Sequence, residues 1–131
     1  MNRNELDKRL RELGIYSEYY YRKEMKALAE LLHEGESLNC VFTGVQDANR
    51  KLAAVSDEKI VIIFGGALGS GDVRMIRREA VSDYRFTKRF LRSTVQLVLP
   101  DETLEFTGVQ AAREELFNWA MAQPLPEETQ E

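Results

Sequence analysis

The sequence feature that most constrains the fold is the unbroken apolar run from Ile60 to Phe64, in which every side chain is β-branched or aromatic. Such residues favour strands, and a strand without polar positions needs apolar cover on both faces. A Ser-Asp-Glu-Lys turn at residues 56–59 joins this run to a preceding strand at residues 51–56. The stretch 51–66 therefore predicts a hairpin at the centre of the domain, buried on both sides.

Two amphipathic helices are expected within residues 1–35. Asn2 and Glu5 have the spacing of a capping box, and Gly14 marks the end of the first helix. The second helix would begin at Ser17. Apolar residues recur at helical spacing in both segments: Leu6, Leu10 and Leu13, then Met25, Leu28, Leu31 and Leu32. These two stripes need cover, either from the sheet of the same chain or from a second copy.

Seven short strand-like runs are expected after the helices, each bounded by turn residues. They cover residues 37–45, 51–56, 59–64, 73–79, 82–88, 94–99 and 103–106. Alternation places Leu38, Cys40 and Phe42 on one face of the first strand. The glycine-rich stretch 64–72 is interpreted as a loop and not as a phosphate cradle, because a strand and no helix follows it. Short strands with frequent turns indicate an antiparallel barrel or sandwich.

A helix is expected to close the domain. Thr107 and Gln110 have the spacing of a second capping box. Four residues would then share the face that plugs one end of the sheet: Val109, Ala112, Leu116 and Trp119. Two prolines end this helix, and residues 123–131 are expected to form an acidic, disordered tail.

No catalytic, metal or cofactor site is expected. The chain has one histidine, His33, and one cysteine, Cys40. His33 falls at the expected end of the second helix, where an imidazole interacts favourably with the helix dipole. Cys40 alternates with apolar neighbours and is expected in the core. A single cysteine cannot form an internal disulfide, and too few metal ligands accompany it for a metal site. Nucleophilic catalysis would need a base near a nucleophile, so we expect a protein that is not an enzyme and binds no metal.

The composition is that of an ordinary globular domain, since 44% of the 131 residues are hydrophobic and 31% are charged. No apolar run approaches the roughly 20 residues that span a bilayer. The first ten residues lack the apolar core of a signal peptide. The expected location is the cytoplasm.

Charge is unevenly distributed along the chain, although the formal net charge is only −4. Residues 74–92 hold seven bases against two acids, whereas residues 101–131 hold one base against eight acids. Phe90 and Leu91 lie among the bases, in a turn that would usually be polar. Such a combination suits a protein contact or an anionic membrane surface. The candidate interaction surface consists of Arg85, Lys88, Arg89, Phe90, Leu91 and Arg92.

The order of these elements, seven antiparallel strands and then one helix, is that of the pleckstrin-homology (PH) superfold. The segments LLHEGESLNCVFTGV and KLAAVSDEKIVIIF, with the basic strand pair and the closing helix, resemble the YokE-like family of bacterial PH domains. The helical lead-in LRELGIYSEYYYRKEMKALAELL is also similar to that family. The resemblance implies a binding module whose ligands are phosphoinositides, peptides or other proteins. In lipid-binding PH domains a basic signature occupies the region of residues 43–51, and here that region offers only Arg50 and Lys51, beside Asp47.

The sequence thus predicts an α+β, mainly β fold: a seven-stranded antiparallel bent sheet capped by a C-terminal helix and preceded by two helices. Residues 1–35 are expected to form a helical extension, 36–122 the PH-like domain and 123–131 the tail. We expect a non-catalytic interaction module for protein contact or self-association, with a homo-oligomer as one outcome. The alternative is peripheral binding to an anionic membrane, and small-molecule binding is the third hypothesis. Nucleic acid is not expected, because Tyr84 and Phe86 alternate in phase with the core.

Overall fold

The computed structural model describes residues 1–64 and 72–126. Seven antiparallel strands form one bent, unclosed sheet in the order β4-β3-β2-β1-β7-β6-β5, as the sequence predicts. The strands are β1 (Leu38–Gln46), β2 (Asn49–Ser56), β3 (Lys59–Phe64), β4 (Val73–Arg77), β5 (Asp83–Thr87), β6 (Ser93–Val98) and β7 (Thr103–Val109). The predicted glycine-rich loop and the end of the predicted tail lie outside the described residues.

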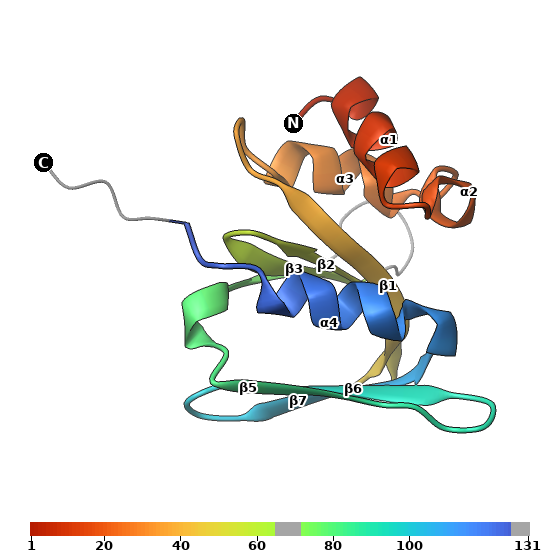
Figure 1. Cartoon of the computed structure of the whole chain (residues 1–131), viewed down its shortest axis with the longest axis vertical. Helices are drawn as coiled ribbons and strands as arrows, with labels where there is room; N and C mark the ends of the chain where they lie inside the picture. Colours follow the sequence, from red (N-terminus) through yellow and green to blue (C-terminus); the bar gives the residue numbers. More distant parts are fainter. Residues whose placement is uncertain (65–71, 127–131) are drawn as a thin grey trace, which may run out of the picture.

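Four α-helices accompany the sheet: α1 (Arg3–Glu12), α2 (Tyr16–Tyr19), α3 (Glu24–Leu31) and α4 (Glu114–Ala122). Two single-turn 3-10 helices, η2 (Arg78–Ala80) and η3 (Ala111–Arg113), lie at the ends of β4 and β7. In Figure 1, α1–α3 lie together on one side of the sheet. Helix α4 lies between β1–β3 and the layer formed by β5–β7. None of the helices in the described part of the chain is both long and apolar enough to cross a membrane.

The sheet bends at β1, which pairs along its length with β2 but meets β7 at Val45 and Thr107. Gly44 makes this approach possible, because a Cβ there would lie 2.9 Å from the Thr107 carbonyl oxygen and 3.0 Å from Val109 Cγ2. The bend separates β2–β4 from β5–β7, and α4 fills the space between them (Figure 1).

Both faces of the central hairpin are buried, as the apolar run predicts. Ile60 and Ile62 belong to the inner core, which α4 completes through Phe117. Val61 and Ile63 belong to a second core on the outer face, which α1–α3 cover. The predicted helices therefore pack against the sheet of their own chain.

The prediction that Leu38 shares a face with Cys40 and Phe42 is wrong. A β-bulge between Leu38 and Cys40 shifts the register of β1 against β2. An inserted residue reverses the alternation of side chains. Leu38 therefore joins the outer core, whereas Cys40 and Phe42 join the inner core.

The N-terminal segment forms three helices where the sequence predicts two. The capping box of Asn2 and Glu5 is present in full, but Ser17 lies inside the single-turn helix α2 and caps nothing. Tyr19 and Met25 are both buried in the outer core. In one continuous helix their side chains would point about 120° apart. The break between α2 and α3 lets both side chains face the sheet.

The predicted face of the closing helix is also wrong. β7 continues to Val109 and η3 follows, so α4 begins at Glu114 and the proposed Thr107 capping box does not exist. Because residues 107–122 do not form one continuous helix, the side chains of α4 do not point in the directions that the sequence predicts. Trp119 is 43% exposed, and Phe117 takes its place in the core with 0% exposure. The Phe117 ring lies 5.7–5.9 Å from the rings of three other aromatic residues: Phe42, Tyr84 and Phe86.

Candidate functional site

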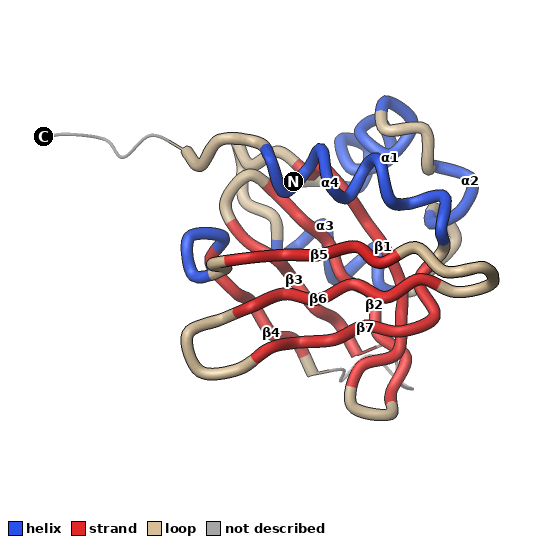
Figure 2. Tube along the Cα trace, turned by 60° about the horizontal axis from the view of Figure 1, so that its bottom comes forward, coloured by secondary structure: helices blue, strands red, loops and turns tan. Residues whose placement is uncertain are grey.

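The β5–β6 hairpin places the six predicted interaction residues on or next to one loop. β5 and β6 pair in continuous register from Asp83 with Val98 to Thr87 with Thr94. Residues 88–92 form the loop, which extends past the neighbouring strands in two views (Figures 1 and 2). We call the following residues the hairpin patch: Arg85, Lys88, Arg89, Phe90, Leu91 and Arg92.

The two apolar side chains of the hairpin patch lie in solvent. Phe90 is 97% exposed and Leu91 is 82% exposed. They do not fold back over the open end of the sheet. Single exposed apolar residues are common, whereas here two neighbours are exposed together at the tip of a projecting loop.

The structure separates the bases of the patch from bases that serve the fold. Arg74 pairs with Glu102, and Arg77 pairs with Glu79. Arg78 is buried. The remaining four bases are exposed and form no ion pair with any acid within residues 1–64 and 72–126: Arg85, Lys88, Arg89 and Arg92.

Arg78 donates hydrogen bonds to three backbone carbonyls. Its Nη2 lies 2.9 Å from the Met121 oxygen and 2.7 Å from the Gln123 oxygen, at the C-terminal end of α4. Its Nη1 lies 3.3 Å from the Asp57 oxygen. Burial lowers the pKa of Arg78 from its usual value, against the opposing effect of Asp57. Arg78 thus joins the β2–β3 turn to α4, and its place in a basic segment gave no sign of this role.

The aromatic residues of β5 belong to the core of the domain. Phe86 is buried in the inner core, and Tyr84 packs against the same core. Neither ring is free to stack on a base, which is how single-stranded nucleic acid is commonly held.

The β1–β2 turn, where lipid-binding PH domains carry their basic signature, is poorly suited to an anion. Asp47 and Ala48 form the turn, with φ of 54° and 65°. The Lys51 ammonium donates to the Gln46 side chain, and the amide of Gln46 donates to the Asp47 carboxylate. The adjoining cavity of about 190 Å³ also contains Asp72. Carboxylates therefore accompany the few bases of this turn.

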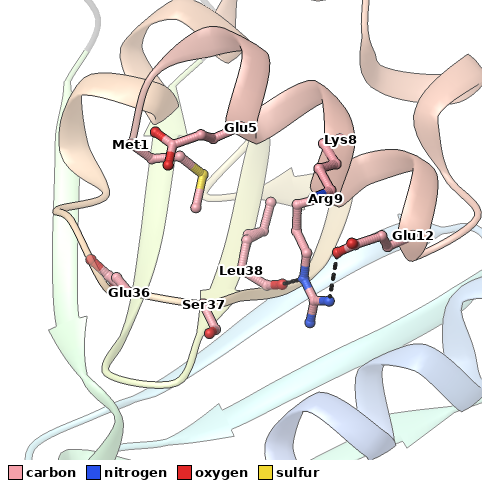
Figure 3. A pocket seen from close by; sticks show the side chains of 8 residues that line it. All are labelled: Met1, Glu5, Lys8, Arg9, Glu12, Glu36, Ser37 and Leu38. Carbon is pink, nitrogen blue, oxygen red and sulfur yellow. Dashed lines mark hydrogen bonds and ion pairs between the residues drawn. The ribbon is translucent and has the colours of Figure 1, made fainter.

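A second cavity, of about 320 Å³, lies between α1 and the start of β1 (Figure 3). Its most prominent polar group is Arg9, which points across the gap to β1. Arg9 donates to the Leu38 carbonyl at 2.6 Å, to the Asn39 side chain at 2.9 Å and to Glu12 at 3.2 Å. Because these contacts occupy the guanidinium, Arg9 fastens α1 to β1 and offers little to a small molecule.

Cys40 lies in the inner core with 0% exposure, as predicted. Burial raises the pKa of its thiol to about 12. A protonated, inaccessible thiol is a poor nucleophile. The sole histidine is at the surface, so the two residues do not form a nucleophile and base pair.

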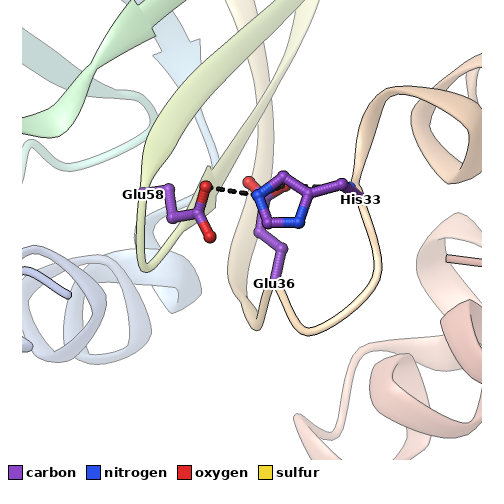
Figure 4. Close-up of side chains that lie close together, drawn as sticks. All are labelled: His33, Glu36 and Glu58. Carbon is purple, nitrogen blue, oxygen red and sulfur yellow. Dashed lines mark hydrogen bonds and ion pairs between the residues drawn. The ribbon is translucent and has the colours of Figure 1, made fainter. Parts of the chain in front are cut away.

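His33 does not end a helix, because α3 stops at Leu31. One nitrogen of its ring, Nε2, lies near two carboxylates, those of Glu36 before β1 and Glu58 in the β2–β3 turn (Figure 4). A hydrogen bond to the Glu34 carbonyl and a second one to Glu58 raise the pKa of His33. The sequence contains a local signal, His-x-x-Glu at residues 33–36, but Glu58 lies 25 residues further along the chain and only the fold brings it close.

Comparison with protein-family models gives no match, and comparison with curated proteins gives none. Solved structures do match. A pleckstrin-homology domain from Shewanella amazonensis SB2B superposes with a TM-score of 0.51 at 13% identity, over 73% of this chain and 94% of that chain. The fold is PH-like. A DUF1696 family protein with a PH domain from Shewanella loihica PV-4 gives a TM-score of 0.49 at 12% identity, over 92% of this chain and 98% of that chain.

The match to the first structure concerns the PH-like fold alone, because its sequence identity is low. The YokE-like assignment remains a prediction that rests on the sequence segments quoted above. Which surface of this PH-like domain binds a partner must therefore be argued from its own residues.

Proposed function

We propose that this PH-like domain is a non-catalytic interaction module that attaches to an anionic membrane surface through the hairpin patch. The observation that carries the proposal is the exposed pair Phe90 and Leu91 at a projecting tip, surrounded by bases that no described acid neutralises. The sequence placed protein contact first and membrane binding second. The shape of the tip reverses that order.

The reversal follows from the area that each partner requires. A stable protein interface buries about 800 Å² on each side, and two side chains at the end of a loop supply a small part of that. A lipid headgroup region needs no matching surface. Burying a Phe or Leu side chain contributes roughly 1.5–3 kcal/mol, and each base near an anionic surface contributes about 1 kcal/mol. Two apolar side chains and four bases together suffice for reversible attachment.

The test is co-sedimentation of the full chain with vesicles. We expect binding to vesicles that contain phosphatidylglycerol and little binding to phosphatidylcholine alone. The Phe90→Ser, Leu91→Ser double variant and the Lys88→Ser, Arg89→Ser double variant should each bind at least about tenfold more weakly. Raising salt from about 0.1 M to about 0.5 M should weaken binding of the wild type, because the Debye length shortens.

The matched control is Arg77→Ser, which removes an exposed base that is paired with Glu79. This variant should bind vesicles like the wild type. Failure of the wild type to sediment with anionic vesicles would refute the membrane proposal, as would equal binding by all the variants.

A second candidate, self-association, is favoured by a different observation. β4 is an edge strand of the open sheet, and its Val73 and Met75 are 41% and 55% exposed. An exposed apolar edge strand can pair with another chain. Light scattering over a range of concentrations distinguishes the candidates. Self-association through β4 should survive the Phe90→Ser, Leu91→Ser change and weaken in Met75→Lys.

A further inference from the structure

Three potential metal-ligand atoms converge where the helical layer α1–α3 meets the central hairpin. His33 Nε2 lies 2.5 Å from Glu58 Oε1 and 3.7 Å from Glu36 Oε1. All three ligand atoms lie within 4.8 Å of one another. Figure 4 shows the Glu58 carboxylate beside the imidazole and the Glu36 side chain close behind it, and the two acids come from different segments of the chain.

The orientation of the imidazole is set from outside this cluster. Nδ1 of His33 lies 2.8 Å from the carbonyl oxygen of Glu34. A carbonyl only accepts, so Nδ1 carries the hydrogen and donates it. In the neutral ring the lone pair of Nε2 then points at carboxylate oxygens, and this arrangement is repulsive unless a cation lies between them. Metal-binding histidines commonly donate their second nitrogen to a backbone carbonyl in this way.

We propose that His33, Glu36 and Glu58 form a binding site for a divalent transition-metal ion such as Zn²⁺. Imidazole with carboxylates is a common ligand set for Zn²⁺, and Zn–N and Zn–O distances of about 2.0–2.2 Å place the ligand atoms roughly 3–4 Å apart. The 3.7 Å separation of His33 from Glu36 lies in that range, and the 2.5 Å separation of His33 from Glu58 would lengthen slightly around a metal ion. The side chains of His33 and Glu58 are 56% and 33% exposed, so both can adjust and water can supply a fourth ligand.

Lys59 competes with the metal for Glu36. The Glu36 side chain is fully buried, and its Oε1 accepts from Lys59 Nζ at 2.8 Å and from the His33 backbone N–H at 3.0 Å. Its Oε2 accepts from Ser56. A bound metal ion would replace the Lys59 ammonium as the countercharge, and the Lys59 side chain, which is 17% exposed, would move toward solvent. Removal of Lys59 should therefore strengthen metal binding, an effect that a purely structural ion-pair cluster does not predict.

Metal binding here would connect two parts of the fold. His33 and Glu36 belong to the segment between α3 and β1, and Glu58 belongs to the β2–β3 turn. A metal ion held by all three would fasten the helical layer to the hairpin. Because a ligand that binds only the folded state stabilises it, the melting temperature should rise with Zn²⁺ concentration.

The test is calorimetric titration of Zn²⁺ into the untagged full chain at one fixed pH. We expect one equivalent to bind, with affinity falling about tenfold or more in His33→Gln and in Glu58→Gln. Lys59→Met should bind several-fold more tightly. Glu30→Gln is the matched control: it removes an exposed acid of α3 outside the cluster and should leave the affinity unchanged.

A second measurement needs no variant. His33 is the only histidine, so its imidazole resonances are unambiguous in an NMR spectrum. These resonances should shift on addition of Zn²⁺. Unmoved resonances, or a His33→Gln variant that binds Zn²⁺ as well as the wild type, would overturn the proposal and leave the cluster as an ion pair of protonated His33 with Glu58. Weaker binding by Lys59→Met would overturn the assignment of Glu36 as a ligand.

Discussion

At the scale of single residues, the basic segment contains side chains with opposite roles. Arg77 and Arg78 are neighbours in sequence, yet Arg77 is exposed and Arg78 is buried. Two of the three carbonyls that Arg78 contacts lie at the end of α4, where a helix leaves backbone acceptors without intrahelical partners. A positive charge is also favourable at that end of a helix. Arg78 thus stabilises the closing helix, whereas the bases of the hairpin patch remain available to a partner.

We predict that Arg78→Met lowers the free energy of unfolding by roughly 1–3 kcal/mol, because buried carbonyls lose their donor while the apolar stem is retained. Urea denaturation measures this change. Arg77→Met, one position earlier, should stay within about 0.5 kcal/mol of the wild type. Equal effects of the two substitutions would contradict the assigned role of Arg78.

At the scale of elements, the closing helix depends on one aromatic side chain. Phe117 meets rings from β1 and from β5, so it joins the two halves of the bent sheet. Phe42 also packs edge-to-face against Phe106 of β7, with ring centroids 5.3 Å apart. Such pairs contribute beyond their buried area. Trp119, a larger residue of the same helix, is only partly buried.

Phe117→Ala should therefore reduce the free energy of unfolding by about 3–5 kcal/mol, the usual cost of removing a buried aromatic ring. Trp119→Ala should cost less than about 1 kcal/mol, because the ring is partly exposed. Chemical denaturation of the two variants side by side makes the comparison. A larger loss for Trp119→Ala would restore the helical face that the sequence predicts.

At the scale of the whole molecule, the helical layer covers one complete face of the central strands. Six apolar side chains beneath it are at most 4% exposed: Leu38, Val41, Leu52, Ala54, Val61 and Ile63. Without α1–α3 this face would become a contiguous apolar patch on the sheet. Patches of that kind lead to association or aggregation. Residues 1–35 therefore contribute to the same folded unit as the strands, although the predicted division at residue 36 still awaits a test.

That test is deletion of residues 1–35. We expect the remaining chain to aggregate or to lose cooperative unfolding, because about 25 cal/mol is lost for each Å² of apolar surface returned to water. Size-exclusion chromatography and thermal denaturation follow the two effects. Adding residues 1–35 as a separate peptide should reverse the aggregation. A truncated chain that elutes without aggregates and melts like the wild type would show that 36–122 is an independent domain.

The sequence by itself determined the elements whose pattern is local. The run from Ile60 to Phe64 predicts a strand buried on both faces, and the structure covers it with two cores. The predicted strands, their antiparallel arrangement and the first capping box are also confirmed. The sequence also singled out Phe90 and Leu91, because they break the rule that turns are polar, and both are exposed in the structure. The role of the hairpin patch as an interaction surface stays a prediction.

Tertiary structure alone decided the rest, because those features depend on contacts between distant segments. The bulge that turns Leu38 to the outer face reflects the register of β1 against β2. Where β7 ends decides which side chains of α4 face the core. Phe117 therefore enters the core and Trp119 does not. Arg78 and Met121 meet across 43 positions, and His33 and Glu58 across 25. Hydrophobic periodicity reports which side of an element is buried, but it does not report which distant polar groups the fold will bring together.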